Sequence, residues 1–183
     1  MIDGTEVRVA GAGHVYVADA GTALPDDLEA MPVGWTDLGY VTEDGVGFTF
    51  GRETEDINAW QGSKIRVLTT AEPVSVALAL MQTNADVLKV ALGGGAITVN
   101  TGVYTYTPPA EGVNTERAMV IEFVDGDLTY RYGLHRVQLE GEVTFTLTKA
   151  GAVTYPLTFG VLDNGDAAKY LIWSDDPAMA DGS

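Results

Sequence analysis

A strict alternation of apolar and polar side chains runs from residue 136 to residue 148 and constrains the fold more than any other feature of the chain. The odd positions hold apolar residues and one glycine, and the even positions hold arginine, glutamine, glutamate or threonine. Because successive side chains of a β-strand point to opposite faces, this period of two predicts a long strand. The alternation resumes from Val153 to Val161 after Lys149-Ala150-Gly151, so the sequence predicts a long hairpin.

The polar face of this hairpin carries no catalytic motif along its whole length, which favours an extended wall over a pocket. Its second strand contains Pro156, and proline is confined to edges and bulges because it has no N–H for a ladder. We therefore expect that strand to be exposed along one side, either bent there or completed by another chain. The polar side chains of the first strand are Gln138, Glu140, Glu142, Thr144, Thr146 and Thr148.

The rest of the chain reads mainly as short strands separated by turns. Strands are expected at 5–9, 14–18, 64–70, 74–81, 96–100, 103–107, 117–124, 128–132 and 170–173. Alternation on both sides of Glu43-Asp44-Gly45 predicts a second hairpin within residues 40–57. The strands at 64–70 and 74–81 are both expected to be central. The predicted class is mostly β, with two packed antiparallel sheets in a sandwich or barrel-like arrangement and long loops.

One short helix is expected at about residues 84–92. The hydroxyl of Thr83 can cap the amide of Asp86, whose carboxylate suits the positive end of the helix dipole. Gly93 supplies the stop. A helix of this length cannot stand alone, so it must pack on a sheet. Its expected apolar face consists of Val87, Leu88, Ala91 and Leu92.

Length, charge and cysteine content narrow the possible functions. The 183 residues fit one domain, which we place at 1–162, followed by an acidic C-terminal tail at 163–183. Beyond the strand expected at 170–173, we expect this tail to be mobile in the free subunit. The chain has 10 Lys and Arg against 26 Asp and Glu, and the net charge of −16 disfavours binding to nucleic acid. Simple solubility also explains this acidity. The absence of cysteine excludes disulfides and Cys-ligated zinc. We expect a soluble protein, made and kept in a cytoplasm, that needs no membrane.

The sequence predicts no catalytic residue, cofactor site or metal site. His14 and His135 have no second ligand at metal spacing, and the serines show no nucleophile-elbow pattern. Glu140 and Glu142 lie at i and i+2, which places two carboxylates about 7 Å apart on one strand, within the range of glycosidases. Their side chains would point in parallel and not across a sugar from opposite sides, so this alternative is the weaker one.

Several blocks of sequence, in order, resemble one family. The first half contributes Leu24-Pro25, the stretch GWTDLGYVTEDGV at 34–46 and ETEDINAWQG at 53–62. The second half contributes GLHRV at 133–137, GEVT at 141–144 and TYPLTF at 154–159. Together, from about residue 20 to 162, they resemble the tail tube (major tail) proteins of long-tailed bacteriophages of the siphophage type. Residues 1–18 and those after Asp163 match no part of that pattern.

The resemblance implies a non-enzymatic structural protein of the virion tail, made in the host bacterial cytoplasm. Proteins of this family form hexameric rings that stack into a tube, with strands of each subunit closing one β-lined channel. The implied partners are further copies of the chain, the tape-measure protein in the lumen, and the tail tip and tail terminator proteins. Viral DNA would pass through the channel without specific binding.

This implied function gives each candidate residue a role. The lumen-facing residues would be Gln138, Glu140, Glu142, Thr144, Thr146 and Thr148. The loop 20–35 and the hairpin 40–57 would act as assembly extensions, because apolar residues on an acidic loop indicate an interface. The interface residues would be Leu24, Pro25, Leu28, Met31, Trp35, Glu53, Glu55 and Trp60. Alternatively, the loop caps its own sheet.

Two other functions remain open on the sequence. A monomeric β-sandwich binding module on a virion or cell surface would require a discrete aromatic platform, whereas the tyrosines and tryptophans are scattered in the sequence. The other is a hydrolase on the same scaffold.

Overall fold

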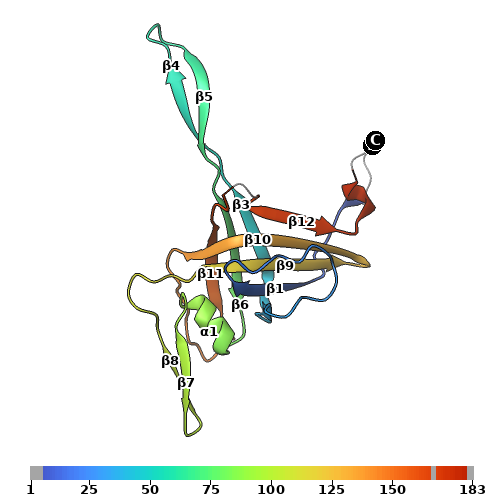
Figure 1. Cartoon of the computed structure of the whole chain (residues 1–183), viewed down its shortest axis with the longest axis vertical. Helices are drawn as coiled ribbons and strands as arrows, with labels where there is room; N and C mark the ends of the chain where they lie inside the picture. The colour runs from blue at the N-terminus through green and yellow to red at the C-terminus, as the bar shows by residue number, and fades with distance from the viewer. Residues whose placement is uncertain (1–5, 166–167, 181–183) are drawn as a thin grey trace.

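The computed structural model describes residues 6–165 and 168–180 and consists mainly of antiparallel strands (Figure 1). The elements in chain order are β1 (Ala12–Asp19), β2 (Thr36–Asp37), β3 (Val41–Phe50), β4 (Glu53–Asn58), β5 (Lys64–Ala71), β6 (Val74–Leu80), α1 (Ala85–Ala91), β7 (Ala96–Asn100), β8 (Val103–Thr107), β9 (Arg117–Asp125), β10 (Leu128–Glu140), β11 (Tyr155–Val161), β12 (Tyr170–Ser174) and the 3-10 turn η2 (Pro177–Met179). Eight strands form one sheet in the order β2-β1-β9-β10-β11-β6-β3, with β12 also paired to β10. The pairs β4–β5 and β7–β8 are separate two-stranded sheets.

Strand β10 connects two halves of the large sheet. Its first part pairs with β9 on one side and with β12 on the other, and its last part pairs with β11. The register with β9 shifts between Leu134 and Val137. In Figure 1, β1, β9, β10 and β12 run across the molecule, while β3, β6 and β11 run lengthwise. The two halves pack against each other as crossed layers, so the predicted mostly β class with antiparallel sheets and one short helix is confirmed.

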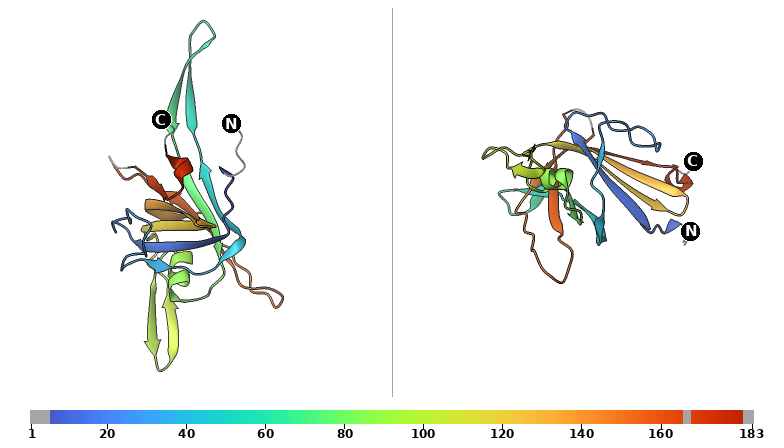
Figure 2. Two further views of the ribbon diagram at one scale, coloured as in Figure 1. Left: turned by 90° about the vertical axis from the view of Figure 1, so that its right-hand side faces the viewer. Right: turned by 90° about the horizontal axis from the view of Figure 1, so that it is seen from below.

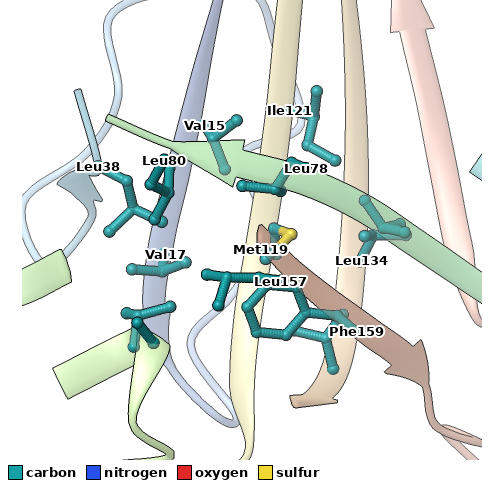
Figure 3. Packing of buried hydrophobic residues seen from close by; sticks show 14 of the residues in the cluster. Val15, Val17, Leu38, Leu78, Leu80, Met119, Ile121, Leu134, Leu157 and Phe159 are labelled. Atoms are coloured by element: carbon teal, nitrogen blue, oxygen red, sulfur yellow. The ribbon is translucent and has the colours of Figure 1, made fainter. Parts of the chain in front are cut away.

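The core lies between these layers (Figure 3). Val76, Leu80, Met119 and Leu134 are almost fully buried, and Phe159 packs among them. Every second residue of β6 points inward, and β6 pairs with both β3 and β11, so the prediction that 74–81 is central is confirmed. Burial of apolar area at about 25 cal/mol per Å² is the main stabilising contribution of this layer packing.

Helix α1 lies where it was expected, but its cap differs. The side chain of Asn84, not Thr83, accepts hydrogen bonds from the amides of Asp86 at 3.1 Å and Val87 at 2.9 Å. An amide oxygen one residue closer to the helix reaches two unpaired N–H groups, which the Thr83 hydroxyl does not. Gly93, with a φ of 76°, follows the helix as predicted. The buried residues of the helix are Val87, Val90 and Ala91.

The strand expected to continue to residue 148 ends at Glu140. Gly141 has a φ of 71°, and residues 141–154 form an irregular connection before β11, seen as the brown loop on the right of the left-hand view in Figure 2. Strands β10 and β11 pair only over Val137–Glu140. A period of two gives a strand only where a neighbouring strand completes the ladder, and Phe145 and Leu147 are left exposed without one.

The prediction of a hairpin within residues 40–57 is also wrong. Val41–Phe50 is a single strand, β3, and it pairs along β6. Gly45, with a φ of 72°, lies in a register shift between Val41 and Val46, so it produces a bulge and not a chain reversal. The strand expected to be central at 64–70 is instead β5, which projects from the molecule with β4 (Figure 1).

Both ends of the described chain join the sheet. The strand expected at 170–173 is confirmed as β12, and Asp176 beyond it is buried, so this segment is not the mobile tail we expected. No strand forms over the described part of 5–9. The division at residue 162 stays a prediction. Residues 1–5, 166–167 and 181–183 lie outside the described residues. They include the first residue of the strand expected at 5–9 and part of the tail predicted at 163–183.

Candidate assembly surfaces

The outer face of the β3, β6, β11 and β10 half is built from small, mostly uncharged residues, and we call it the small-residue face. Registered pairs across these strands place its members in two rows. The rows are Thr49, Ser75, Gly160 and Gln138, then Gly47, Ala77, Thr158 and Glu140. Of the six residues predicted to share one polar face, the structure therefore brings together only Gln138 and Glu140. The other four lie in the 141–154 connection.

Glu140 carries the one charge among these eight residues. Its carboxylate lies over Gly160, in the space that a Cβ at that position would occupy. Gln138 is held by a hydrogen bond from its Nε2 to the carbonyl of Asn114 at 3.1 Å. The face consequently carries mostly small side chains, three of them with hydroxyls, and a single carboxylate.

Strand β3 forms an open edge of the large sheet. It is last in the strand order, and among the described residues its only strand partner is β6. An unpaired edge exposes a row of backbone N–H and C=O groups that can accept a strand from another chain. Glu43 and Asp44 are exposed at the bulge and place negative charge beside this edge.

Two hairpins project in opposite directions from the sandwich (Figure 1). The β4–β5 hairpin, which we call the arm, exposes Ile65, Val67 and, at its turn, Trp60, which is 100% exposed. The β7–β8 hairpin exposes Val99 and Tyr104. Isolated two-stranded hairpins are marginally stable in water, so both are expected to gain a partner. Of the predicted interface residues, Glu53 and Glu55 lie on β4 and are exposed.

The loop 20–35 packs on its own sheet. The guanidinium of Arg131, which is buried on β10, donates to the backbone carbonyls of Asp27 at 2.7 Å and Glu29 at 2.9 Å and also to the carboxylate of Glu122. Leu24 lies close to Gly133 on the same face of β10. The predicted interface residues of this loop are therefore largely covered by the chain itself: Pro25 is buried, and Leu24, Leu28, Met31 and Trp35 are half-buried. Their role in an interface stays a prediction.

A groove of about 800 Å³ opens between β3 and the β1 and β9 strands. Phe48, Phe123 and Tyr132 line it, and the ring of Tyr132 lies near both of the others, with centroids 5.0 Å apart for Phe48 and Tyr132 and 6.1 Å apart for Phe123 and Tyr132. Tyr40, which is largely exposed, and His14 also line this aromatic groove. The tertiary structure thus gathers aromatic residues that are far apart in the sequence.

The charged residues that line the aromatic groove are acidic. They are Asp37, Glu43 and Glu122, and neither lysine nor arginine is present among its lining residues. His14 Nδ1 lies 2.9 Å from an oxygen of Asp37. Sequence reasoning missed this pair because the two residues come from different strands, β1 and β2, which pair only in the fold.

The two ends of the described chain meet beside β10. Arg8 donates to the carboxylate of Asp176 and to the hydroxyl of Tyr130, and Tyr130 donates to Asp176. The hydrogen bond from Tyr130, followed by that from the Ala178 amide and the charge of Arg8, holds the pKa of Asp176 below its usual value. This cluster fixes the N-terminal segment and the segment after β12 to the same strand.

A comparison with protein families decides where the chain belongs. The family described as "Phage tail tube protein" matches residues 2–181. The chain belongs to this family. The resemblance of its sequence blocks to the tail tube proteins is therefore confirmed. The role of the protein is structural.

Two curated proteins from mycobacteriophages are similar to this tail tube family member. Major tail protein Gp23 of Mycobacterium phage D29 is 27% identical over 190 residues, covering 93% of this chain and 91% of the relative. Major tail protein Gp23 of Mycobacterium phage L5 is 28% identical with the same coverage. Both relatives are named as tail components, and the match spans nearly the whole of each chain.

One solved structure with a similar chain is the sheath-tube complex of an extracellular contractile injection system, PVC, in its extended state. The likeness covers 92% of each chain at 9% identity, with a TM-score of 0.48. In the described part of the chain, no group of three or more histidine, cysteine, aspartate or glutamate side chains could hold a metal ion. Within residues 6–165 and 168–180, no helix is long and apolar enough to span a membrane.

Proposed function

We propose that six copies of this chain close into a ring and that the rings stack into the tube of a phage tail. The observation that carries this proposal is the open edge at β3, because strand addition by a neighbouring copy would complete the ladder of the large sheet. A closed ring leaves every subunit with its edge paired. The same addition without closure would lead to aggregation, which explains why a chain with such an edge requires a defined assembly.

The small-residue face is the surface that suits the lumen. The outer face of the other sheet half is covered by the loop 20–35, so this face is the bare one of the two. Hydroxyls, methyl groups and the carboxylate of Glu140 would give a passing DNA duplex few cations to bind. Repulsion between carboxylates and phosphates acts over about 8 Å at physiological salt, which keeps DNA away from the wall.

The remaining parts of the proposal follow from the family. The tape-measure protein would occupy the lumen during assembly, and tail tip and tail terminator proteins would bind the ends of the tube. The protein would be made in the host cytoplasm, would end in the virion tail and would catalyse no reaction. The arm and the β7–β8 hairpin, which extend from opposite ends of the sandwich, are suited to contacts between successive rings.

Negative-stain electron microscopy of the purified protein tests this function. We expect tubes or six-fold rings at high protein concentration, because association of copies pairs the β3 edge. Compact monomers at every concentration would contradict the proposal and favour a monomeric binding module.

A charge reversal tests the placement of the lumen. Glu140→Lys should leave rings intact but slow the release of DNA from assembled phage, since it places a cation on the small-residue face. Asp127→Lys, which makes the same charge change in the exposed turn between β9 and β10, is the matched control. Equal release rates for both variants would refute this placement.

A further inference from the structure

A small pocket beside α1 contains two cations that have no acidic partner. It has a volume of about 300 Å³ and is lined by Lys89 of α1 and by Arg117, the first residue of β9. Both residues are half-buried. Within residues 6–165 and 168–180, neither forms an ion pair. We call this site the cation pocket.

Two carboxylates lie at the rim of the cation pocket. Asp19 is the registered partner of Arg117 across β1 and β9, and Asp86 lies three residues before Lys89 on α1. Both acidic residues are exposed. The charges that line the pocket therefore sum to zero, in a chain with a net charge of −16. An incoming carboxylate meets less repulsion here than over the rest of the surface, and salt screens partly buried cations less than exposed ones.

The bulge of β3 at residues 42–45, which we call the acidic bulge, carries the complementary charge. Glu43 and Asp44 are exposed and form no ion pair within the described part of the chain. The register between β3 and β6 shifts between Val41 and Val46, so both acidic residues lie outside the ladder. A strand that a neighbouring copy adds along 46–50 therefore leaves their carboxylates available to the side of that copy.

The acidic bulge and the cation pocket lie at the same level along the lengthwise strands. Val41 pairs with Leu80 at one end of the β3–β6 ladder, where the amide of Met81 also donates to the carbonyl of Tyr40. Helix α1 begins at Ala85, four residues after Met81. Both sites are consequently at the end of the ladder opposite to the arm (Figure 1).

The two sites lie at opposite ends of the transverse strands. Ala12 pairs with Val124 at one end of the β1–β9 ladder, and Asp19 pairs with Arg117 at the other. Ala12 borders the same groove as Glu43, whereas Asp19 and Arg117 line the cation pocket. The eight residues of β1 place these ends about 24 Å apart. A head-to-tail ring requires complementary sites on the two sides of each subunit, at one level, because rotation about the ring axis does not change the level of a residue.

We propose that the cation pocket of each subunit binds the acidic bulge of the next copy in the same ring, with Lys89 and Arg117 facing Glu43 and Asp44. This inference rests on the ring proposed above and names the charged surfaces that meet when it closes. It gives the two half-buried cations a partner. It also makes the association directional, because two bulges or two pockets that face each other bring like charges together.

The carboxylates at the base of the arm do not fit this role. Glu53 and Glu55 lie on β4, beyond the end of β3 at Phe50, and so at the other end of the β3–β6 ladder. In a copy of the same ring they are at a different level from α1. The acidic bulge is at the correct level, and its charges are unpaired in the described part of the subunit.

Mixing two variants with reversed charges tests the contact. The pocket variant, Lys89→Glu with Arg117→Glu, and the bulge variant, Glu43→Lys with Asp44→Lys, should each form rings at least about tenfold less than the natural protein, because like charges meet at every contact. An equal mixture should restore the rings, since opposite charges meet wherever the two variants alternate. A ring of six allows strict alternation, and native mass spectrometry should find three copies of each variant in one hexamer.

A matched control separates the contact from the effect of net charge. Arg66→Glu with Lys149→Glu makes the same charge change as the pocket variant at two exposed cations elsewhere. This control should form rings in the natural yield, and circular dichroism should show the natural fold for all variants. An equal loss of rings in the control would mean that total charge governs the assembly, and it would overturn the contact.

Crosslinking provides an independent test with both pocket cations in place, because the natural chain has no cysteine. Glu43→Cys with Asp86→Cys, which we call the bulge–pocket variant, keeps Asp44 for the contact. After treatment of the rings with a short bismaleimide, we expect a ladder of covalent oligomers that stops at six chains, because a contact within a ring closes on itself. Asp127→Cys with Asp86→Cys moves the first thiol to the turn between β9 and β10 and should give no ladder.

The outcomes separate this contact from the proposed function. Natural protein that forms neither rings nor tubes contradicts the function itself. Where the natural protein does form rings, the contact is overturned if either charge variant also forms them normally, if the mixture forms none, or if the bulge–pocket variant gives no ladder. A ladder that continues beyond six chains also overturns it, since the thiols then meet between rings. Recovery of rings in the mixture, with a ladder that stops at six, supports the contact.

Discussion

Strands β5 and β6 follow each other in the chain, but β5 is exposed to solvent and β6 lies in the core. β5 reads KIRVLTTA and β6 reads VSVALAL, and both are rich in residues that favour strands. Leu68 is the most sheltered residue of β5 and is only half-buried, whereas β6 buries Val74, Val76, Leu78 and Leu80. One strand stands in solvent with β4, and the other forms the centre of a layer.

The difference comes from what alternates with the apolar residues. In β5 the alternate positions hold Lys64 and Arg66, and its partner β4 carries Glu53, Glu55 and Asp56. A hairpin with charges on both faces cannot enter a core without a large desolvation penalty. In β6 the alternate positions hold serine and alanine, which sit on the small-residue face without a penalty. Strand propensity therefore decided that both are strands, and the intervening side chains decided their depth.

Truncation of one side chain in each strand tests this contrast most strongly. Leu80→Ala should lower the free energy of unfolding of the free subunit by about 2–5 kcal/mol, because it leaves a cavity in the core. Ile65→Ala, on the exposed arm, should change it by less than about 0.5 kcal/mol. Chemical denaturation measures both. A similar loss for the two variants would mean that the arm packs against the subunit in solution.

Deletion of whole segments gives the next largest effect. Removal of 54–69, replaced by a short glycine turn, should leave the unfolding free energy nearly unchanged and abolish tubes. Removal of 25–31 should cost about 1–3 kcal/mol, since the buried guanidinium of Arg131 loses its backbone acceptors. Denaturation curves and electron microscopy should be recorded for both deletions. Normal stability without 25–31 would contradict the anchoring role of Arg131.

A smaller effect on stability is expected at Asp176, just after β12. Strand β12 joins the large sheet, whereas β5 projects from it. Because the folded pKa of Asp176 lies below its value in the unfolded chain, this residue contributes stability above about pH 4. That contribution is lost as the pH falls below this value. Tyr130→Phe removes the largest cause of the shift, so it should lower stability at neutral pH and weaken the dependence on acid. The urea midpoint of unfolding, measured for both proteins between about pH 3 and 7, tests this prediction. A midpoint that falls with acid as steeply in Tyr130→Phe as in the natural protein would contradict it.

The smallest effect is expected on the outer face of β6. Ala77→Lys places a cation like those of β5 at an exposed position and should change the unfolding free energy by less than about 0.5 kcal/mol. Val76→Lys, one residue away and pointing inward, should abolish folding. Circular dichroism of the two variants provides the comparison. Equal damage by both would mean that the outer face is covered in the free subunit.

Much of the fold could be predicted from local pattern, but the boundaries that matter for assembly could not. The alternation after Glu140 resembles that before it, yet it forms no strand because no neighbour pairs with it. Gly45 looks like the turn of a hairpin and acts as a bulge, because β6 offers a longer partner for β3. Of the candidate site, Gln138, Glu140 and Trp60 lie on surfaces suited to assembly, whereas the apolar residues of the loop 20–35 mostly pack on their own sheet.

By itself, the sequence determined that the chain is mostly β, that it has one short helix ended by Gly93, and which family its ordered blocks resemble. These are local properties, set by side-chain period, glycine conformation and residue order. The tertiary structure alone decided which strand became the arm, that distant rings line one acidic groove, and that β3 was left at an edge. Such properties depend on which segments compete for the same partner, and that competition is settled only when the whole sheet forms.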